Sequence, residues 1–295
     1  MNIAIWVQYD TIATPNKVNR KSLLKSAFAV LDNPNIVAVV ESIPMSINNL
    51  NTIDKRELIN IDCDLIIVTG HDVDLAPILA EAKELSLDTY KFVLDRTVCL
   101  PGFTPEKYKQ LRKSNLSILS MGWWAGIAYH NLGLPILSPT INMYTSEEDF
   151  MNFLPEARWH FKKDLYFDRT EHNSDLDIDY PIFCLGDMQW FMNGFASEAD
   201  ALKAWNERKD KINWSNVLVT MHTSDPAVLE RFDCLPYEKK VCFVPFETEF
   251  DSGFYVDATA YEGNILYASE AVIAGDIQAY DVWDLLLHSQ KTPIK

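Results

Sequence analysis

The stretch Asp62-Cys-Asp-Leu-Ile-Ile-Val-Thr-Gly70 decides the fold class, because an unbroken apolar and β-branched run stands between polar and turn-forming residues. Such a run is typical of a strand that is buried on both faces of a parallel sheet. Similar runs occupy residues 3–7, 36–40 and 91–94, and helical patterns occupy residues 21–31 and 76–85. Strands that alternate with such helices predict crossover units, so residues 1–113 are expected to form a Rossmann-like, largely parallel α/β domain.

The loop after the first of these strands lacks the glycines of a dinucleotide-binding fold. It reads Gln8-Tyr-Asp-Thr-Ile-Ala-Thr-Pro15, with no glycine to let the backbone approach a pyrophosphate. The sequence contains no Gly-x-x-x-x-Gly-Lys phosphate loop either. Nicotinamide, flavin and P-loop chemistry are therefore unsupported, and the cofactor stays unknown.

The bulk composition argues against nucleic-acid and membrane partners. The chain has 295 residues, enough for two cores, and its 42 acidic and 26 basic residues give a net charge of −16. That field repels phosphate backbones and anionic lipid headgroups. The sequence starts without the basic flank and apolar core of a signal peptide, and no run reaches the roughly 18 apolar residues of a membrane span. We expect a cytoplasmic protein without membrane insertion, and leave a homo-oligomeric state open.

The cysteines indicate a reducing compartment. Their number is odd and none forms a Cys-x-x-Cys pair; they are Cys63, Cys99, Cys184, Cys234 and Cys242. Most lie in or beside apolar runs, so we expect buried thiols and no zinc site.

A break at Pro101-Gly102, followed by a helix to about residue 113, separates the two halves of the chain. Beyond it, strands are expected at residues 116–119, 182–185, 217–221 and 241–244, and helices at residues 124–132, 147–154 and 197–212. The acidic residues 164–181 are expected to form a loop or an insertion. These elements predict a second, three-layer α/β domain over residues 114–295.

The second half carries a recognisable pattern, Ser117-Ile-Leu-Ser-Met-Gly-Trp-Trp-Ala-Gly-Ile-Ala-Tyr-His-Asn-Leu-Gly-Leu-Pro135. Three further blocks, residues 180–187, 204–214 and 231–241, follow in the expected order. Over about residues 110–250 the chain resembles a bacterial family that is defined as a domain of unknown function and often labelled exopolysaccharide biosynthesis protein. The resemblance implies a role in assembling exopolysaccharide or capsular polysaccharide.

Two departures from that family's pattern bear on catalysis. Relatives tend to carry Asn-Asn-Cys-Trp-Gly-Gly where this chain has Met121-Gly-Trp-Trp-Ala-Gly126. They also tend to carry an acidic residue and a histidine where this chain has Gln189 and Asn193. If those residues perform chemistry in relatives, this chain has altered it.

The turn from the strand at 116–119 into the next helix is the first candidate binding site. Gly122 and Gly126 allow a sharp turn into a helix whose N-terminal N–H groups suit a phosphate or carboxylate. Trp123 and Trp124 could stack on a sugar or base, although two core tryptophans are the alternative. His130 on the same helix and Asn142 in the run that follows are further candidates for binding.

Three polar residues after later strands are candidates for catalysis. Asp187 follows the strand at 182–185 and His222 follows the strand at 217–221, where open α/β sheets usually bind ligands. Asp187 could act as a base, and His222 could transfer protons near neutral pH with Asp225 orienting it. As alternatives, Asp187 and Asp225 could cap the segments that follow them.

Two charged segments have residue types that bind phosphate or metal ions. Asp175-Leu-Asp-Ile-Asp179 resembles the Asp-x-Asp element of many glycosyltransferases, but the motif is short, a solvated loop is favoured, and we predict no metal site. Arg208 lies in a basic cluster and could hold a phosphate in a bidentate way; an ordinary solvated helix face is the alternative.

The sequence therefore predicts a glycosyltransferase-like protein of surface-polysaccharide biosynthesis that binds an activated sugar or saccharide phosphate. A non-catalytic binding or scaffold protein of the same pathway is the alternative, and acyl or phosphoryl transfer is a third. The prediction requires Trp124, Asp187 and His222 to converge at the carboxyl edge of the second sheet.

Overall fold

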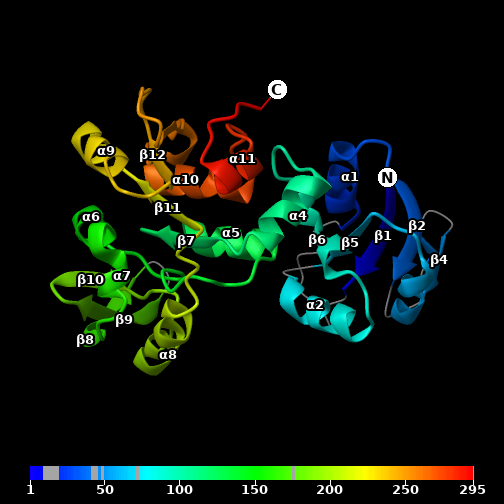
Figure 1. The fold of residues 1–295 in the computed structure, drawn as a ribbon, viewed down its shortest axis with the longest axis horizontal. Coiled ribbons are helices and arrows are strands. Elements are labelled where there is room, and N and C mark those ends of the chain that lie inside the picture. Colours follow the sequence, from blue (N-terminus) through cyan, green and yellow to red (C-terminus); the bar gives the residue numbers. More distant parts are fainter. Residues whose placement is uncertain (9–19, 41–45, 48–49, 71–72, 175–176, 295) are drawn as a thin grey trace. The chain divides into compact units, whose positions relative to one another are not determined.

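The computed structural model describes residues 1–8, 20–40, 46–47, 50–70, 73–174 and 177–294, and the predicted glycine-free loop lies mostly outside these residues. The chain forms two compact units (Figure 1). The first consists of residues 1–113 and 130–135, and the second of residues 114–129 and 136–295. The division into domains 1–113 and 114–295 stays a prediction.

The first unit is built on a parallel sheet, as predicted. Five parallel strands lie in the order β4 (Leu50–Ile53), β2 (Asn35–Val40), β1 (Asn2–Val7), β5 (Leu65–Thr69) and β6 (Phe92–Leu94). A two-residue strand, β3 (Ser46–Ile47), pairs antiparallel with β4 at the edge. The chain therefore has a mixed α/β fold with a five-stranded parallel sheet, and two of these six strands, β3 and β4, were not predicted.

Both faces of the five-stranded sheet are buried. The helices of this unit are α1 (Arg20–Val30), η1 (Lys55–Asn60), α2 (Leu75–Glu84), η2 (Thr89–Lys91), α3 (Asp95–Val98) and α4 (Pro105–Lys113). Trp6 of β1 belongs to one apolar cluster with Leu75 and Ile78 of α2. Ile3 and Ile5, which alternate with Trp6 and point to the other face, are also buried. α1 and α2 lie on opposite sides of the sheet (Figure 1), so the apolar runs of these strands are explained by burial on two faces.

The second unit contains a four-stranded, fully parallel sheet. Its strands lie in the order β13 (Gly253–Tyr255), β12 (Lys239–Val244), β11 (Val217–His222) and β7 (Ser117–Ser120). Its helices include α5 (Trp124–Leu132), α9 (Pro226–Asp233), η4 (Thr259–Tyr261), α10 (Ile265–Ala274) and α11 (Val282–His288). We call the edge where these four strands end the carboxyl edge and the edge where they begin the amino edge. The elements after residue 244 were not predicted, although α10 has an Asn264 N-cap and a left-handed Gly275 C-cap.

A three-stranded antiparallel sheet takes in most of the expected acidic loop together with the predicted strand at residues 182–185. Its strands are β8 (Tyr166–Asn173), β9 (Ile178–Leu185) and β10 (Met188–Phe191), in the order β10-β9-β8. The loop prediction for residues 164–181 was wrong, because polar residues pair across the two strands. Tyr180 of β9 lies opposite Glu171 of β8 and donates a hydrogen bond to its carboxylate at 3.1 Å.

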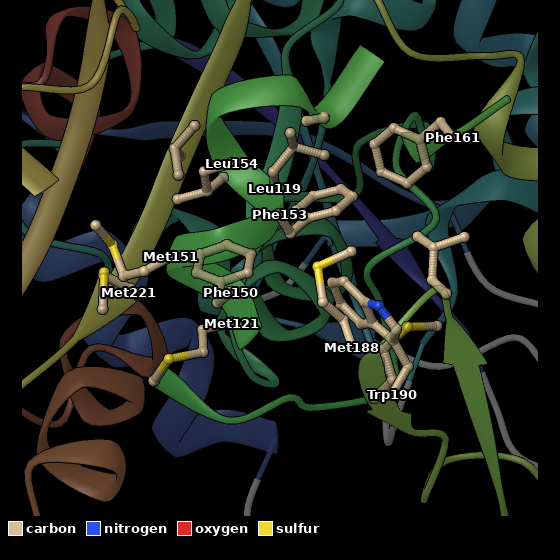
Figure 2. Close-up of a cluster of buried hydrophobic side chains, with 14 of the residues drawn as sticks. Leu119, Met121, Phe150, Met151, Phe153, Leu154, Phe161, Met188, Trp190 and Met221 are labelled. Atoms are coloured by element: carbon tan, nitrogen blue, oxygen red, sulfur yellow. The ribbon is translucent and has the colours of Figure 1, made fainter. Parts of the chain in front are cut away.

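One core joins the two sheets of the second unit (Figure 2). α6 (Glu147–Phe153), η3 (Leu154–Glu156), α7 (Ala157–His160) and α8 (Glu198–Lys209) contribute to it. Phe150 and Phe153 of α6 meet the Trp190 ring of β10 edge-on, at centroid distances of 6.5 and 5.2 Å. Leu119 and Met121, from the end of β7, belong to the same cluster. The antiparallel sheet is therefore fixed to the parallel sheet by packing.

The cysteines agree only in part with the expected buried thiols. All five lie in the described part of the chain and are free. Cys63 and Cys242 are buried, Cys99 and Cys184 are half-buried, and Cys234 is exposed, which corrects the prediction for Cys234. Among the described residues, no helix has both the length and the apolar character to cross a membrane.

Candidate functional site

The turn from β7 into α5 lies at the carboxyl edge of the four-stranded sheet, as the sequence predicts. The Met121 N–H donates to the Thr220 carbonyl of β11 at 3.1 Å, and the Met121 carbonyl accepts from the Thr145 N–H at 3.1 Å. These bonds hold the turn between the neighbouring strand and the loop at residues 138–145. Gly122, Trp123 and Trp124 follow directly, so the N-terminus of α5 is presented at this edge.

Trp124 and His222 come together at a small hollow beside this turn. The hollow has a volume of about 10 Å³, and its lining includes Ser120, Gly122, Trp124, Thr220, Met221, His222, Phe243, Leu266 and Ser269. A space of this size holds about one water molecule and excludes a sugar. Trp124 is buried and tilts against the Phe243 ring at 5.9 Å, which makes it the core tryptophan of the two.

A carboxyl group that sequence reasoning missed, Glu270 of α10, contacts the N-terminus of α5. Burial raises the pKa of the Glu270 carboxyl to about 7, although the backbone N–H of Trp123 donates a hydrogen bond to it. Glu270 is only partly buried, so solvent can reach it. The sequence did hold a signal, because Glu270 is the single charged residue within the apolar helix Ile265–Ala274. A carboxyl tuned to about pH 7 can accept or donate a proton under physiological conditions.

Glu270 also corrects the predicted use of this helix end. The sequence predicts that the N-terminus of α5 binds a phosphate or carboxylate from a ligand. In the structure the protein's own carboxyl, from Glu270, accepts from the Trp123 N–H. An anionic ligand at this N–H would therefore compete with Glu270.

His222 does not have the protonation behaviour expected of it. Burial lowers the pKa of its imidazole to about 4, so the ring is neutral near pH 7 and a poor proton carrier there. Asp225 does not orient the ring, because it is the N-cap of α9 and its carboxylate accepts from the Ala227 N–H at 2.8 Å. The capping alternative thus describes Asp225, with Pro226 opening the helix.

Trp123, the other tryptophan of the turn, lies at the surface. Its side chain is 36% exposed, and its Nε1–H donates to the Asn193 Oδ1 at 3.1 Å. Positions 123 and 193 are two of those at which the chain departs from the pattern of the family that it resembles. The two departures therefore lie in direct contact.

Asn142 and Gly126 also lie near the turn from β7 into α5. Asn142 has a left-handed backbone, with φ of 61°, and its carbonyl accepts from the Gly194 N–H at 3.0 Å. A Cβ atom on Gly194 would lie 2.4 Å from the Asn142 Cβ, so only glycine fits there. A Cβ atom on Gly126 would lie 3.3 Å from the Asn142 Oδ1. The structure thus groups Gly122, Trp123, Trp124, Gly126, Asn142 and His222.

Asp187 does not belong to this group. It lies exposed in the tight turn between β9 and β10, whose ends pair antiparallel through Leu185 and Met188. The prediction placed Asp187 at the carboxyl edge of a parallel sheet, and this is wrong because β9 belongs to the antiparallel sheet. Sequence alone did not separate the two cases, since a buried strand of either kind reads as an apolar run.

His130 and Arg208 are also placed away from the α5 N-terminus. His130 is exposed in the last turn of α5, and its carbonyl accepts from Arg96 Nη2 at 3.3 Å. Arg208 lies in the last turn of α8, with its guanidinium 5.8 Å from the centre of the Phe195 ring, and burial lowers the pKa of that guanidinium. The guanidinium packs on an aromatic ring, its Nη1 is buried without a hydrogen-bond partner among the described residues, and the phosphate contact stays a prediction.

The Asp-x-Asp segment lies at the end of the β8–β9 hairpin, with Asp175 outside the described residues. The Asp179 Oδ1 lies 2.8 Å from the His172 Nδ1, and the Asp177 Oδ1 lies 3.7 Å from the His172 Nε2. All three side chains are more than half exposed. Within the described ranges, no cluster of three or more His, Cys, Asp or Glu residues is arranged to hold a metal ion.

Comparison with known proteins shows which family this chain resembles and over which residues. An uncharacterized protein of Haemophilus influenzae (strain ATCC 51907 / DSM 11121 / KW20 / Rd) is 24% identical over 181 residues, which are 60% of this chain and 80% of that protein. The family described as "Domain of unknown function (DUF1919)" matches residues 96–286, which include the turn at Gly122, Asn193, His222 and Glu270. This chain belongs to the DUF1919 family.

Proposed function

We propose that this chain works in the assembly of a bacterial exopolysaccharide or capsular polysaccharide, as a glycosyltransferase-like protein that binds an activated sugar. One observation carries the proposal. A carboxyl with a pKa of about 7, that of Glu270, lies beside the exposed Trp123 at the carboxyl edge of a parallel sheet. This edge is where ligands bind in open α/β sheets. The family resemblance suggests the pathway. The carboxyl of Glu270 can accept a proton near pH 7, as the transfer reaction requires.

Glu270 takes the role that the sequence assigned to Asp187. In the proposed reaction a sugar ring stacks on Trp123, and a hydroxyl group of the acceptor donates its hydrogen bond to Glu270. As the acceptor oxygen forms its bond to the anomeric carbon, the bond to the donor's phosphate breaks and the hydroxyl proton passes to Glu270. His222 and Trp124 line the small hollow at the same edge, and the lining of that hollow does not include Glu270.

The proposal includes the finer fold prediction. In the first unit the parallel strands, numbered in chain order, lie in the order 3-2-1-4-5. That order supports a Rossmann-like unit. Helices α9 and α10 both contact β12 of the parallel sheet in the second unit, which supports a layered α/β domain there.

The test is a thermal-shift panel of nucleotides and nucleotide sugars at pH 7, with turnover of each hit measured by release of the free nucleotide. We expect at least one nucleotide sugar to stabilise the protein, by about 2.7 kcal/mol when its concentration is 100 times Kd. Glu270→Gln should keep the fold and lose at least 100-fold in turnover, because it removes the proton acceptor. Glu230→Gln, an exposed carboxylate of α9, is the matched control and should be unchanged. Absence of any response across the panel would refute the proposal.

A non-catalytic binding protein of the same pathway is the second candidate. It is favoured by the contact between Trp123 and Asn193, which fills the turn with a bulky indole at two positions where the family pattern differs. It is also favoured by Glu270 occupying the helix N-terminus. Nucleotide-sugar binding without turnover, equal in the parent and in Glu270→Gln, would select this candidate over the transferase.

A further inference from the structure

A wide hollow lies at the amino edge of the four-stranded sheet, opposite in the sheet to the site described above. It has a volume of about 690 Å³, within the range of small-molecule sites. Three short segments supply its lining, namely residues 155–159, 214–217 and 236–239. The last two lead directly into β11 and β12. We call this hollow, with its neighbour described below, the amino-edge groove.

The groove is rich in aromatic side chains that other residues hold in place. Trp159 is 52% exposed, and the ammonium of Lys163 lies 3.4 Å from the centre of its ring. The guanidinium of Arg158 lies 4.9 Å from the centre of the Trp214 ring. The Tyr237 hydroxyl donates to the Leu154 carbonyl at 2.7 Å. Such contacts fix the rings before any ligand arrives, which lowers the entropy cost of binding.

The charges in the lining balance each other. Arg158 and Lys239 are cationic, and Glu156 and Glu238 are anionic. The Lys239 ammonium already donates to the Asn216 Oδ1 at 2.7 Å. A balanced lining in a chain of net charge −16 does not attract a polyanion. It suits a neutral ligand whose groups both donate to carboxylates and accept from cations, as sugar hydroxyls do.

A second hollow adjoins the first. It has a volume of about 540 Å³ and shares Tyr237 and Glu238 with the first. Its other lining residues are largely polar and include Asp233, Lys240, Asp251, Ser252, His288, Gln290 and Lys291. Two hollows with common walls suit an extended ligand of repeated polar units better than a single small molecule.

We infer that the amino-edge groove binds a neutral oligosaccharide, with one sugar face stacked on the exposed Trp159 and further sugar units beside the Arg158–Trp214 pair. Aromatic rings offer the flat, weakly polar surface that the C–H face of a pyranose covers. The inference deepens the proposed function, on which the choice of ligand class rests, by giving the growing glycan a second binding site in addition to that of its acceptor hydroxyl at Glu270.

The test is a titration of the intact protein, labelled with 15N in its tryptophan indoles, with maltohexaose, cellohexaose, chitohexaose and glucose. The indole N–H signals of Trp159 and Trp214 should shift with at least one hexasaccharide, more strongly than with glucose. Trp159→Ala should weaken that binding about tenfold or more, and Trp159→Phe should restore part of it. Tyr166→Ala, which removes an exposed aromatic of β8, should leave it unchanged.

Glu270→Gln separates this inference from the proposed function. The variant should lose nucleotide-sugar turnover and keep hexasaccharide binding, whereas Trp159→Ala should keep the response to nucleotide sugars. The inference is overturned if no hexasaccharide shifts these indole signals, or if Trp159→Ala binds as the parent does. It is also overturned if a proline-rich decapeptide or a nucleotide sugar occupies the groove instead.

Discussion

The two edges of the four-stranded parallel sheet are built from the same strands and yet differ in what covers them. At the carboxyl edge, α10 and the turn at Gly122 leave a hollow of about 10 Å³ beside a carboxyl with a raised pKa. At the amino edge, short turns into β11 and β12 leave a hollow of about 690 Å³ lined by aromatic rings. The carboxyl edge is largely covered and has a carboxyl group with a pKa of about 7, whereas the amino edge is open and exposes an aromatic side chain.

The connections explain the difference. The turn into β11 is closed by a bond from the Asn216 N–H to the Asn213 carbonyl, and the turn into β12 by a bond from the Tyr237 N–H to the Leu235 carbonyl. Such tight turns add little chain to cover the amino edge. The carboxyl edge receives longer segments, since residues 256–275 return to it and bring Leu266, Ser269 and Glu270. Our proposals accordingly place the transfer reaction, with its acceptor hydroxyl, at the carboxyl edge and a second binding site for the glycan chain at the amino edge.

The largest effect on stability is expected in the apolar core that joins the two sheets of the second unit. Trp190→Ala should lower the free energy of unfolding by about 3–5 kcal/mol, because it removes a fully buried ring packed on Phe150 and Phe153. Urea denaturation followed by circular dichroism measures it. A loss below about 1 kcal/mol would mean that the antiparallel sheet is not fixed to the parallel sheet as described.

Two buried threonines at the carboxyl edge should respond in opposite directions. Thr140→Val should cost about 1–3 kcal/mol, because its Oγ1 accepts from the Ser120 N–H at 3.0 Å. Thr220→Val should be neutral or stabilising by about 1 kcal/mol, because its Oγ1 has no partner among the described residues and lines the closed hollow. Denaturation midpoints of the two variants make the comparison, and equal losses would contradict it.

The pH dependence of stability should separate Glu270 from His222. The pKa of Glu270 is raised to about 7, so the folded state binds the extra proton and loses stability as pH rises from about 4.5 to 7. The pKa of His222 is lowered to about 4, so the unfolded state binds the extra proton and stability rises between about pH 4 and 6.5. The two slopes oppose each other in the parent.

Single variants should reveal each slope. Glu270→Gln should gain about 1–2 kcal/mol over the parent at pH 8, a figure reduced for the partial exposure of this carboxyl, and the gain should vanish toward pH 5. His222→Gln should lose stability less steeply than the parent as pH falls from 6.5 to 4. Unfolding measured by urea at pH 4.5, 6 and 8 tests both, and parallel profiles for all three proteins would contradict the assignment.

The smallest effect on stability is expected at the open edge. Trp159→Ala should change the free energy of unfolding by less than about 1 kcal/mol, because half of the ring is exposed and only a surface contact with Lys163 is lost. Thermal unfolding beside Trp190→Ala measures it. A larger loss would mean that Trp159 supports the core and is not a free binding surface.

Local signals in the sequence determined the parallel strands and several helix boundaries. The apolar run Leu65–Thr69 and its counterparts are buried strands, and Asp225-Pro226 begins α9. These features depend on the local sequence. A run of apolar residues favours burial whatever packs against it, and an N-cap side chain hydrogen-bonds to the first turn of its own helix. Trp124 and His222 at one edge also followed from the rule that parallel strands end together.

Only the tertiary structure decided which groups meet. Asp187 follows an apolar strand as His222 does, but pairing places it in an antiparallel turn. Glu270 reaches Trp123, and Trp123 reaches Asn193, because segments distant in sequence fold onto one edge. The amino-edge groove arises from three turns with no common motif. Burial of each strand is set by its own residues, whereas the approach of two side chains is set by how the remaining chain covers the sheet.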